Sequence, residues 1–108
     1  NVIFSVVKSR KNPYFNMVEM RKDGRVSLSK RLSRAVTSRQ SAPCVYDVNA
    51  SIYFYDRNYL MDKGNVTVIS GDSMAYIMDG VSSLDIDTEL DFKFVEFLAK
   101  EGIWKDEI

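Results

Sequence analysis

The chain has 108 residues, of which 45% are hydrophobic and 28% are charged, so it can bury one modest core and forms at most one domain. Its 15 basic and 15 acidic side chains cancel, it contains no histidine, and no apolar run approaches the ~20 residues that span a bilayer. These features exclude a membrane-spanning protein and, with no signal-peptide pattern, predict a soluble, cytoplasmic one. The lone Cys44 allows neither an internal disulfide nor a cysteine metal cluster.

The zero net charge hides a division along the chain. Residues 1–45 carry ten lysines and arginines against two acidic residues, whereas residues 46–108 carry five against thirteen. The first part is therefore a candidate anion-binding surface and the second a candidate cation-binding one, unless the two simply face each other. Lys8, Arg10 and Tyr14 combine positive charge with an aromatic ring, but no recognisable nucleic-acid motif accompanies them. No nucleic-acid partner is predicted.

The first half of the chain predicts strands. Residues 2–8 are apolar and β-branched, which is typical of a buried strand. Residues 16–20 and 25–29 alternate between apolar and polar side chains on either side of Asp23-Gly24. An Asp-Gly pair suits a hairpin turn with a positive φ at the glycine. This part of the chain therefore predicts one buried strand followed by a hairpin.

The second half alternates between strands and helices. Asp56 is placed to cap a short helix and Gly64 to end it. A final helix follows from apolar residues that recur every 3.6 residues, with Gly102 just beyond its end. The predicted elements are a polar connection over 38–43, a strand over 49–55, a helix over 57–63, strands over 66–70 and 74–78, and a helix over 88–100.

The segment before the final helix carries two acidic residues in alternation. In an extended stretch side chains alternate faces, so Asp85 and Asp87 project to one side while Leu84 and Ile86 point into the protein. Two carboxylates so placed can hold a hard divalent cation. The alternative is that the acids only cap the helix, with Thr88-x-x-Asp91 as a capping box. Both interpretations stand on spacing alone.

The start of the chain bears on its fold class. A buried strand begins at once, and there is no Gly-rich phosphate loop of either common type. An α/β sheet normally has a strand and a crossover helix before such a strand. We therefore expect an α/β fold in which this chain is the C-terminal part of a longer protein.

Five motifs follow one another along the chain. They are Asn12-Pro13-Tyr14-Phe15, Arg39-Gln40-x-x-Pro43, Tyr46-x-x-Asn49-Ala50-Ser51-Ile52-Tyr53, Tyr76-Ile77-Met78 and Ser83-Leu84-Asp85-Ile86-Asp87-Thr88-Glu89-Leu90-Asp91. In this order and near this spacing they resemble the C-terminal half of the acylneuraminate cytidylyltransferases, which are the CMP-sialic acid synthetases and their legionaminic and pseudaminic acid relatives. The resemblance covers almost the whole chain and leaves out the family's N-terminal half, whose loop holds CTP.

The resemblance implies an activity and a site. The fold would be the C-terminal part of a Rossmann-like nucleotidyltransferase with a mixed sheet, and the reaction would transfer CMP from CTP to the anomeric hydroxyl of a nonulosonic acid, releasing pyrophosphate. Such a transfer needs alignment and charge neutralisation, so Mg²⁺ is the implied cofactor. The implied site residues are Asp85 and Asp87 as catalytic metal ligands, and Arg39, Gln40, Asn49 and Tyr53 as contacts to the sugar acid.

Arg39 matches the family's cation for the substrate carboxylate, which a guanidinium can hold through two parallel hydrogen bonds.

The resemblance also divides the chain into a core and an arm. Residues 1–41 and 74–108 would form the core sheet and helix, and residues 42–73 would form an arm that packs against a partner subunit in a homodimer. An apolar surface on this arm that a short chain cannot bury alone agrees with a symmetric dimer.

The chain also departs from the family pattern. Ala50-Ser51 stands where Gly-Ala is common after the asparagine, and Asp47 stands where some sialic acid enzymes have arginine. Residues 66–69 lack the aromatic pair that those enzymes use near the sugar. The nonulosonic acid is therefore left open, although the Asn-Pro-Tyr-Phe-Asn-Met form favours the diamino relatives of sialic acid. The alternative function is a non-catalytic dimerisation or interaction module with the same fold.

Overall fold

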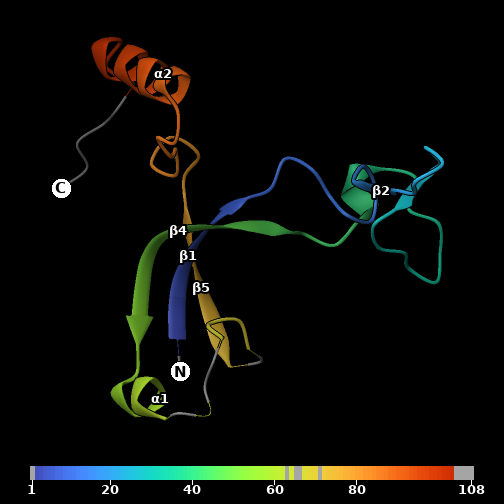
Figure 1. The fold of residues 1–108 in the computed structure, drawn as a ribbon, viewed down its shortest axis with the longest axis horizontal. Coiled ribbons are helices and arrows are strands. Elements are labelled where there is room, and N and C mark those ends of the chain that lie inside the picture. The colour runs from blue at the N-terminus through green and yellow to red at the C-terminus, as the bar shows by residue number, and fades with distance from the viewer. Residues whose placement is uncertain (1, 63, 65–66, 71, 104–108) are drawn as a thin grey trace. The chain divides into compact units, whose positions relative to one another are not determined.

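A computed structural model describes residues 2–62, 64, 67–70 and 72–103. The chain divides into two compact units, one formed by Asn1–Val7 with Val48–Ile108 and the other by Lys8–Asp47. No helix among the described residues is both long and apolar enough to cross a bilayer. The elements in chain order are β1 (Val2–Lys8), β2 (Val18–Met20), β3 (Val26–Leu28), the short 3₁₀ helix η1 (Arg39–Ser41), β4 (Tyr46–Tyr55), α1 (Arg57–Met61), β5 (Ser73–Met78) and α2 (Glu89–Lys100) (Figure 1).

A three-stranded mixed sheet is the centre of the larger unit. The strand order is β4-β1-β5, and β1 runs parallel to β5 with Phe4 beside Ala75. β4 runs in the opposite direction to β1 (Figure 1). One face of β1 forms the core, because Val2, Phe4 and Val6 are buried at every second position. The buried strand predicted over residues 2–8 is thereby confirmed.

β4 begins earlier than the sequence predicts and carries a backbone irregularity. It starts at Tyr46, because the chain already pairs there with the end of β1, where the Ser9 amide donates to the Val45 carbonyl at 3.1 Å. Within the strand, Ala50 has a φ of 56°. An L-residue in this left-handed region carries a cost of roughly 1–2 kcal/mol, which a glycine avoids. Ala50 thus bears a conformational cost at the position where the family resemblance leads us to expect glycine.

The segment after β4 only partly follows the prediction. Asp56 caps α1 by accepting a hydrogen bond from the Asn58 amide at 2.8 Å, as expected. The helix ends at Met61 with Asp62 as its C-cap, before the predicted end at residue 63, which itself lies outside the described residues. The predicted strand over residues 66–70 is wrong for residues 67–70, which form no strand. The Thr67 hydroxyl instead accepts from the Ile69 amide at 3.2 Å, and such local bonds compete with strand pairing.

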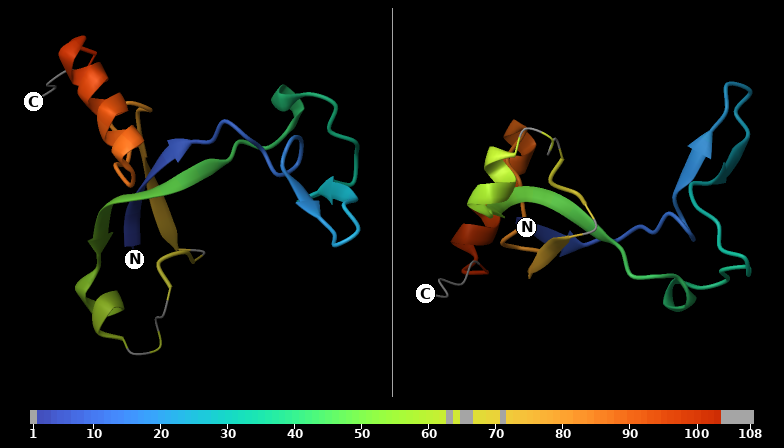
Figure 2. Two further views of the ribbon diagram at one scale, coloured as in Figure 1. Left: turned by 45° about the horizontal axis from the view of Figure 1, so that its top comes forward. Right: turned by 90° about the horizontal axis from the view of Figure 1, so that it is seen from below.

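The opposite face of the sheet is apolar and exposed. The parallel register places Ile3 beside Met74 and Ser5 beside Tyr76, on the face opposite the core. Ile3, Met74 and Tyr76 are 42%, 66% and 58% exposed, whereas Ser5 is 0% exposed. The described part of the chain therefore covers Ser5 and leaves the apolar side chains around it exposed. Figures 1 and 2 show α1 beyond one end of the strands and α2 beyond the other, so neither lies across that face.

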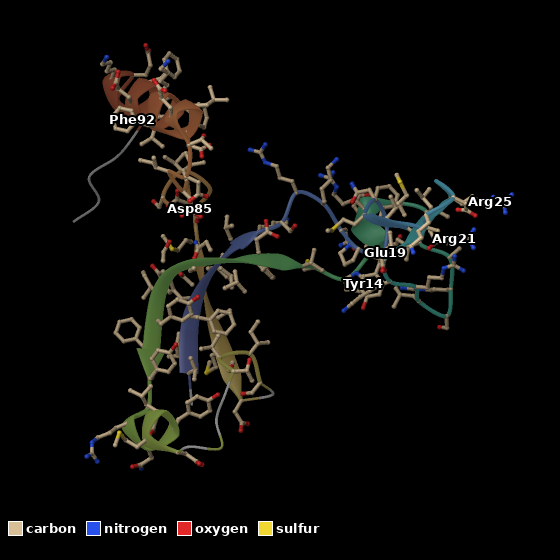
Figure 3. The ribbon with its side chains drawn as sticks, in the orientation of Figure 1. Tyr14, Glu19, Arg21, Arg25, Asp85 and Phe92 are labelled. Atoms are coloured by element: carbon tan, nitrogen blue, oxygen red, sulfur yellow. The ribbon has the colours of Figure 1, made fainter. Side chains whose placement is uncertain are left out.

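The smaller unit, residues 8–47, contains the predicted hairpin. β2 and β3 pair antiparallel, with Glu19 opposite Ser27. The turn closes through a hydrogen bond from the Gly24 amide to the Arg21 carbonyl at 2.9 Å, and Gly24 has the expected positive φ of 85°. The Asp-Gly prediction is confirmed. Figure 3 labels Glu19, Arg21 and Arg25 on this hairpin.

Asn12 organises the rest of this unit. Its side-chain amide donates to the Pro43 carbonyl at 2.8 Å, and its side-chain oxygen accepts from the Tyr14 amide at 2.9 Å. The side chain is buried, and its backbone carbonyl accepts from three following amides. The first motif therefore closes a tight turn and joins it to the segment after η1. Lys30 lies over the ring of Tyr14, with its Nζ atom 5.8 Å from the ring centroid.

The expected arm over residues 42–73, which would pack against a partner subunit, stays a prediction. Residues 42–47 belong to the smaller unit and the rest of β4 to the larger one. Since β4 is a neighbour of β1 in the sheet, most of it packs with the core strands.

Candidate functional site

The two predicted metal ligands lie on the connection between β5 and α2. Asp85 and Asp87 are both exposed, in an irregular segment that follows a turn and leads into the helix (Figure 3). The expectation that Ile86 points into the protein is wrong, since it is 53% exposed. Strict alternation requires a strand held in a sheet, and residues 84–87 pair with none. Leu84 alone is partly buried, as predicted.

A capping box fixes the end of this segment. The Thr88 hydroxyl accepts from the Asp91 amide at 3.1 Å, while the Asp91 carboxylate accepts from the Thr88 amide at 2.9 Å and from the Asp87 amide at 3.1 Å. The predicted capping box is confirmed. The hydrogen bond from the Asp87 amide, followed by that from the Thr88 hydroxyl, lowers the pKa of Asp91 below its usual 3.8. The cap is therefore complete at neutral pH and is lost only as the pH falls through this lowered pKa.

The beginning of the segment is fixed by a second turn. The Asp79 carboxylate accepts from the Val81 amide at 3.0 Å and from the Ser82 amide at 2.9 Å and hydroxyl at 2.7 Å. The hydrogen bond from the Ser82 amide is the main reason that the pKa of Asp79 lies below 3.8. Ser83 adds a hydrogen bond from its hydroxyl to the Asp79 carbonyl at 2.7 Å. The two acidic residues thus lie between two hydrogen-bonded turns.

The chemistry of the donor set fits a magnesium ion. No group of three or more histidine, cysteine or acidic side chains that could hold a metal occurs among the described residues. The carboxylates of Asp85 and Asp87 accept no hydrogen bond from that part of the chain, so their oxygens are available. Mg²⁺ keeps several waters and takes one or two protein carboxylates together with substrate phosphates. The helix cap leaves both carboxylates free, because it uses the carboxylate of Asp91.

Asn49 is buried and fully hydrogen-bonded. Its side-chain oxygen accepts from the Ser5 hydroxyl at 2.5 Å and from the Ser51 amide at 3.3 Å. Its amide nitrogen donates to the Ser83 hydroxyl at 3.2 Å and to the Met78 sulfur at 3.3 Å. The structure therefore brings Asn49 close to the turn that precedes Asp85. Its expected contact to the sugar would require it to give up these partners.

Tyr53 lies on β4 and is partly engaged in aromatic packing. Its ring stacks on Tyr55 with centroids 6.2 Å apart and is tilted against the core residue Phe4 at 6.5 Å. It is still 38% exposed, so part of the residue is accessible. Contact to a substrate remains a prediction for this residue.

Arg39 and Gln40 belong to the smaller unit. They occupy the single turn of η1, and both side chains are exposed. The Arg39 guanidinium forms no ion pair with any described residue, so it is available to a ligand. The other four predicted site residues belong to the larger unit.

Two participants in this region were not predicted from the sequence. Ser5 is fully buried at 0% exposure within an otherwise apolar strand, and Ser83 joins Asn49 to the turn. The sequence signal that could have identified Ser5 is a single hydroxyl in a run of apolar residues predicted to be buried. A buried polar group needs a hydrogen-bond partner, so Ser5 must contact another polar group.

The aromatic face of α2, formed by Leu90, Phe94 and Phe97 at helical spacing, is also uncovered. All three residues are more than half exposed, and Leu98 is the one buried hydrophobic residue among the described residues of this helix. Figure 3 labels Phe92, which is also more than half exposed and lies on another side of the helix. The apolar spacing that predicts the helix therefore gives a candidate contact surface.

Comparison with known proteins gives two curated relatives. The chain is 46% identical over 99 residues to post-translational flagellin modification protein B of Campylobacter coli, in an alignment that covers 92% of this chain and 40% of the relative. It is also 46% identical over 96 residues to CMP-N,N'-diacetyllegionaminic acid synthase of Campylobacter jejuni, covering 89% of this chain and 39% of that protein. The chain thus spans about two-fifths of the length of these relatives. No protein-family model matches the chain.

Proposed function

We propose that the whole protein activates a nonulosonic acid with CTP, because this chain matches, as its motifs predict, a fragment of the CMP-nonulosonic acid synthetase family. The observation that carries the proposal is the 46% identity, over 89% of this chain, to a CMP-N,N'-diacetyllegionaminic acid synthase. We take N,N'-diacetyllegionaminic acid as the first substrate to test, and this chain as the C-terminal, sugar-binding and metal-binding part of a Rossmann-like nucleotidyltransferase.

The proposed reaction is a displacement at the α-phosphorus of CTP. The anomeric hydroxyl oxygen of the acid forms a bond to the α-phosphorus, the bond from that phosphorus to the bridging oxygen of the β-phosphate breaks, and the hydroxyl proton is released. The products are the CMP ester of the acid and pyrophosphate. Because charge accumulates on the phosphate oxygens, the protein's task is to align the two substrates and to neutralise that charge.

We assign the site residues the roles that the resemblance implies. Asp85 and Asp87 would hold Mg²⁺, which neutralises phosphate charge when bound. Their exposed carboxylates, held between two turns, are free for this task. The guanidinium of Arg39, which has no ion pair among the described residues, would clamp the carboxylate of the sugar acid. Gln40 and the partly exposed Tyr53 would be further sugar contacts.

Uncovered apolar surface supports a larger assembly. The exposed sheet face and the aromatic face of α2 need covering by the remainder of a longer protein or by a second subunit. β4 continues the exposed apolar surface, with Phe54 66% exposed. We propose a homodimer in which this strand contributes to the interface. Light scattering of the full-length protein at micromolar concentration should give twice the mass of one chain, and a purely monomeric mass would contradict the interface.

The experiment that tests the activity compares two lengths of the protein. Full-length protein with CTP, Mg²⁺ and N,N'-diacetyllegionaminic acid should release pyrophosphate, measured in a coupled phosphate assay. Residues 1–108 alone should release none above background, because the loop that binds CTP is expected outside this chain. Full activity of the 108-residue chain would overturn the assignment of the nucleotide site to the missing part.

A further inference from the structure

A buried hydrogen-bonded chain links the core strands to the turn before the acidic residues. Ser5 in β1 donates from its hydroxyl to Asn49 in β4, and Asn49 donates to the Ser83 hydroxyl in the turn after β5. Ser5 is 0% exposed and Asn49 is 8% exposed. The Ser5 hydroxyl also accepts from the Ile52 amide at 2.9 Å, which holds β4 in place after the irregularity at Ala50. The three serine and asparagine side chains thus tie three separate segments together.

The hydrogen-bonding capacity of Asn49 is already used within the chain. A carboxamide offers two acceptor positions on oxygen and two donor hydrogens on nitrogen. The oxygen accepts from Ser5 and Ser51, and the nitrogen donates to Ser83 and Met78. Turning this amide toward a substrate would leave buried polar groups without partners, at a cost that a single sugar contact does not offset.

The segment that carries the acids is anchored at both ends. At its beginning, Asn49 binds Ser83, which in turn binds the Asp79 carbonyl. At its end, the Asp91 carboxylate binds the Asp87 amide. Asp85 lies between these anchors, two residues after Ser83. Releasing the first anchor would let the segment move relative to the sheet while leaving the helix cap intact.

We propose that Asn49 is a positioning residue for the Asp85–Asp87 segment, holding it through Ser83, and that it is not a direct contact to the sugar. The functional part of this inference rests on the proposed function, since it takes the two carboxylates as the metal-binding pair. When a residue that orients the metal ligands without contacting the metal is removed, metal affinity typically falls 10- to 100-fold.

The test uses the full-length protein with Asn49→Ala and Ser83→Ala, and with Val6→Ala as a control. Val6 is 3% exposed in the same sheet and has no part in the hydrogen-bonded chain, so it lowers stability without releasing the turn. Mn²⁺ titration followed by electron paramagnetic resonance measures metal affinity, and hydrogen exchange measures the mobility of amides 81–87. Both test variants should weaken Mn²⁺ binding about 10-fold. Both should also speed exchange at these amides, because the turn loses its hydrogen bond to the sheet. The control should change neither at a temperature where all variants are folded.

The outcomes separate the alternatives. Wild-type Mn²⁺ affinity and exchange in Asn49→Ala, with weaker binding of the sugar acid, would show a direct sugar contact and overturn the proposal. If Val6→Ala changes Mn²⁺ affinity and hydrogen exchange as much as Asn49→Ala does, Asn49 contributes only to general stability. That result would also overturn the proposal. If the wild-type protein binds no Mn²⁺, the proposed metal site fails, and the exchange measurement still decides whether Asn49 holds the segment.

Discussion

Replacing Asp85 or Asp87 with asparagine is expected to lower the turnover of the full-length protein at least ~100-fold, as when a charge-neutralising metal is displaced. Asparagine keeps the shape of the side chain and removes its charge. Both carboxylates are exposed and accept no hydrogen bond from the described chain, so the melting temperature should not change. Turnover is measured by pyrophosphate release at saturating substrates over a range of Mg²⁺ concentrations.

Asp72→Asn is the matched control for these variants. Asp72 is an exposed acidic residue of the same unit with no assigned role, and its loss should leave turnover within about twofold of the wild type, as for most surface changes. Unchanged turnover and unchanged Mg²⁺ dependence in both test variants would remove Asp85 and Asp87 from the mechanism. Asp85 and Asp87 would then contribute only to the negative charge at the N-terminus of α2, which favours the helix.

Arg39→Lys is expected to reduce kcat/KM for the sugar acid by ~10- to 100-fold, which corresponds to the one to three kcal/mol of a charged hydrogen bond. Lysine keeps the positive charge and loses the two-point geometry that orients a carboxylate. CTP affinity should barely change, because the interaction concerns only the acid. Separate Kd measurements for the two substrates, together with a melting curve, give the required comparison.

Arg34→Lys provides the control, since Arg34 is an exposed arginine of the same unit with no assigned contact. It should leave both affinities unchanged. Equal weakening of CTP and acid binding by Arg39→Lys, together with a lowered melting temperature, would mean that Arg39 only anchors the connection before Pro43. That result would contradict the proposal that Arg39 binds the carboxylate of the sugar acid.

Local rules account for the elements that the sequence predicts well. The hairpin follows from Asp23-Gly24, because a glycine takes the positive φ that the turn requires. The start of α2 follows from the Thr88 and Asp91 capping box, whose groups are three residues apart. In both cases the interactions lie within a few residues of one another, so the pattern in the sequence contains the whole physical cause.

Two expectations fail where competing interactions decide. The strand expected over 66–70 is replaced at residues 67–70 by side-chain bonds to the backbone, and Ile86 is exposed because its segment has no strand partner. The contacts of Asn49 join residues 44 and 34 positions apart. No spacing in the sequence indicates such contacts, so the burial of Asn49 could not be predicted from its motif.

The central claim is tested most directly by ³¹P nuclear magnetic resonance of the products made by the full-length protein. With CTP, Mg²⁺ and N,N'-diacetyllegionaminic acid, the predicted result is one phosphodiester resonance from the CMP ester and pyrophosphate in equal amount. CTP that stays intact with this acid, and with sialic and pseudaminic acids, in a preparation that is folded and dimeric, would contradict the claim. The chain would then be part of a non-catalytic interaction module with the same fold.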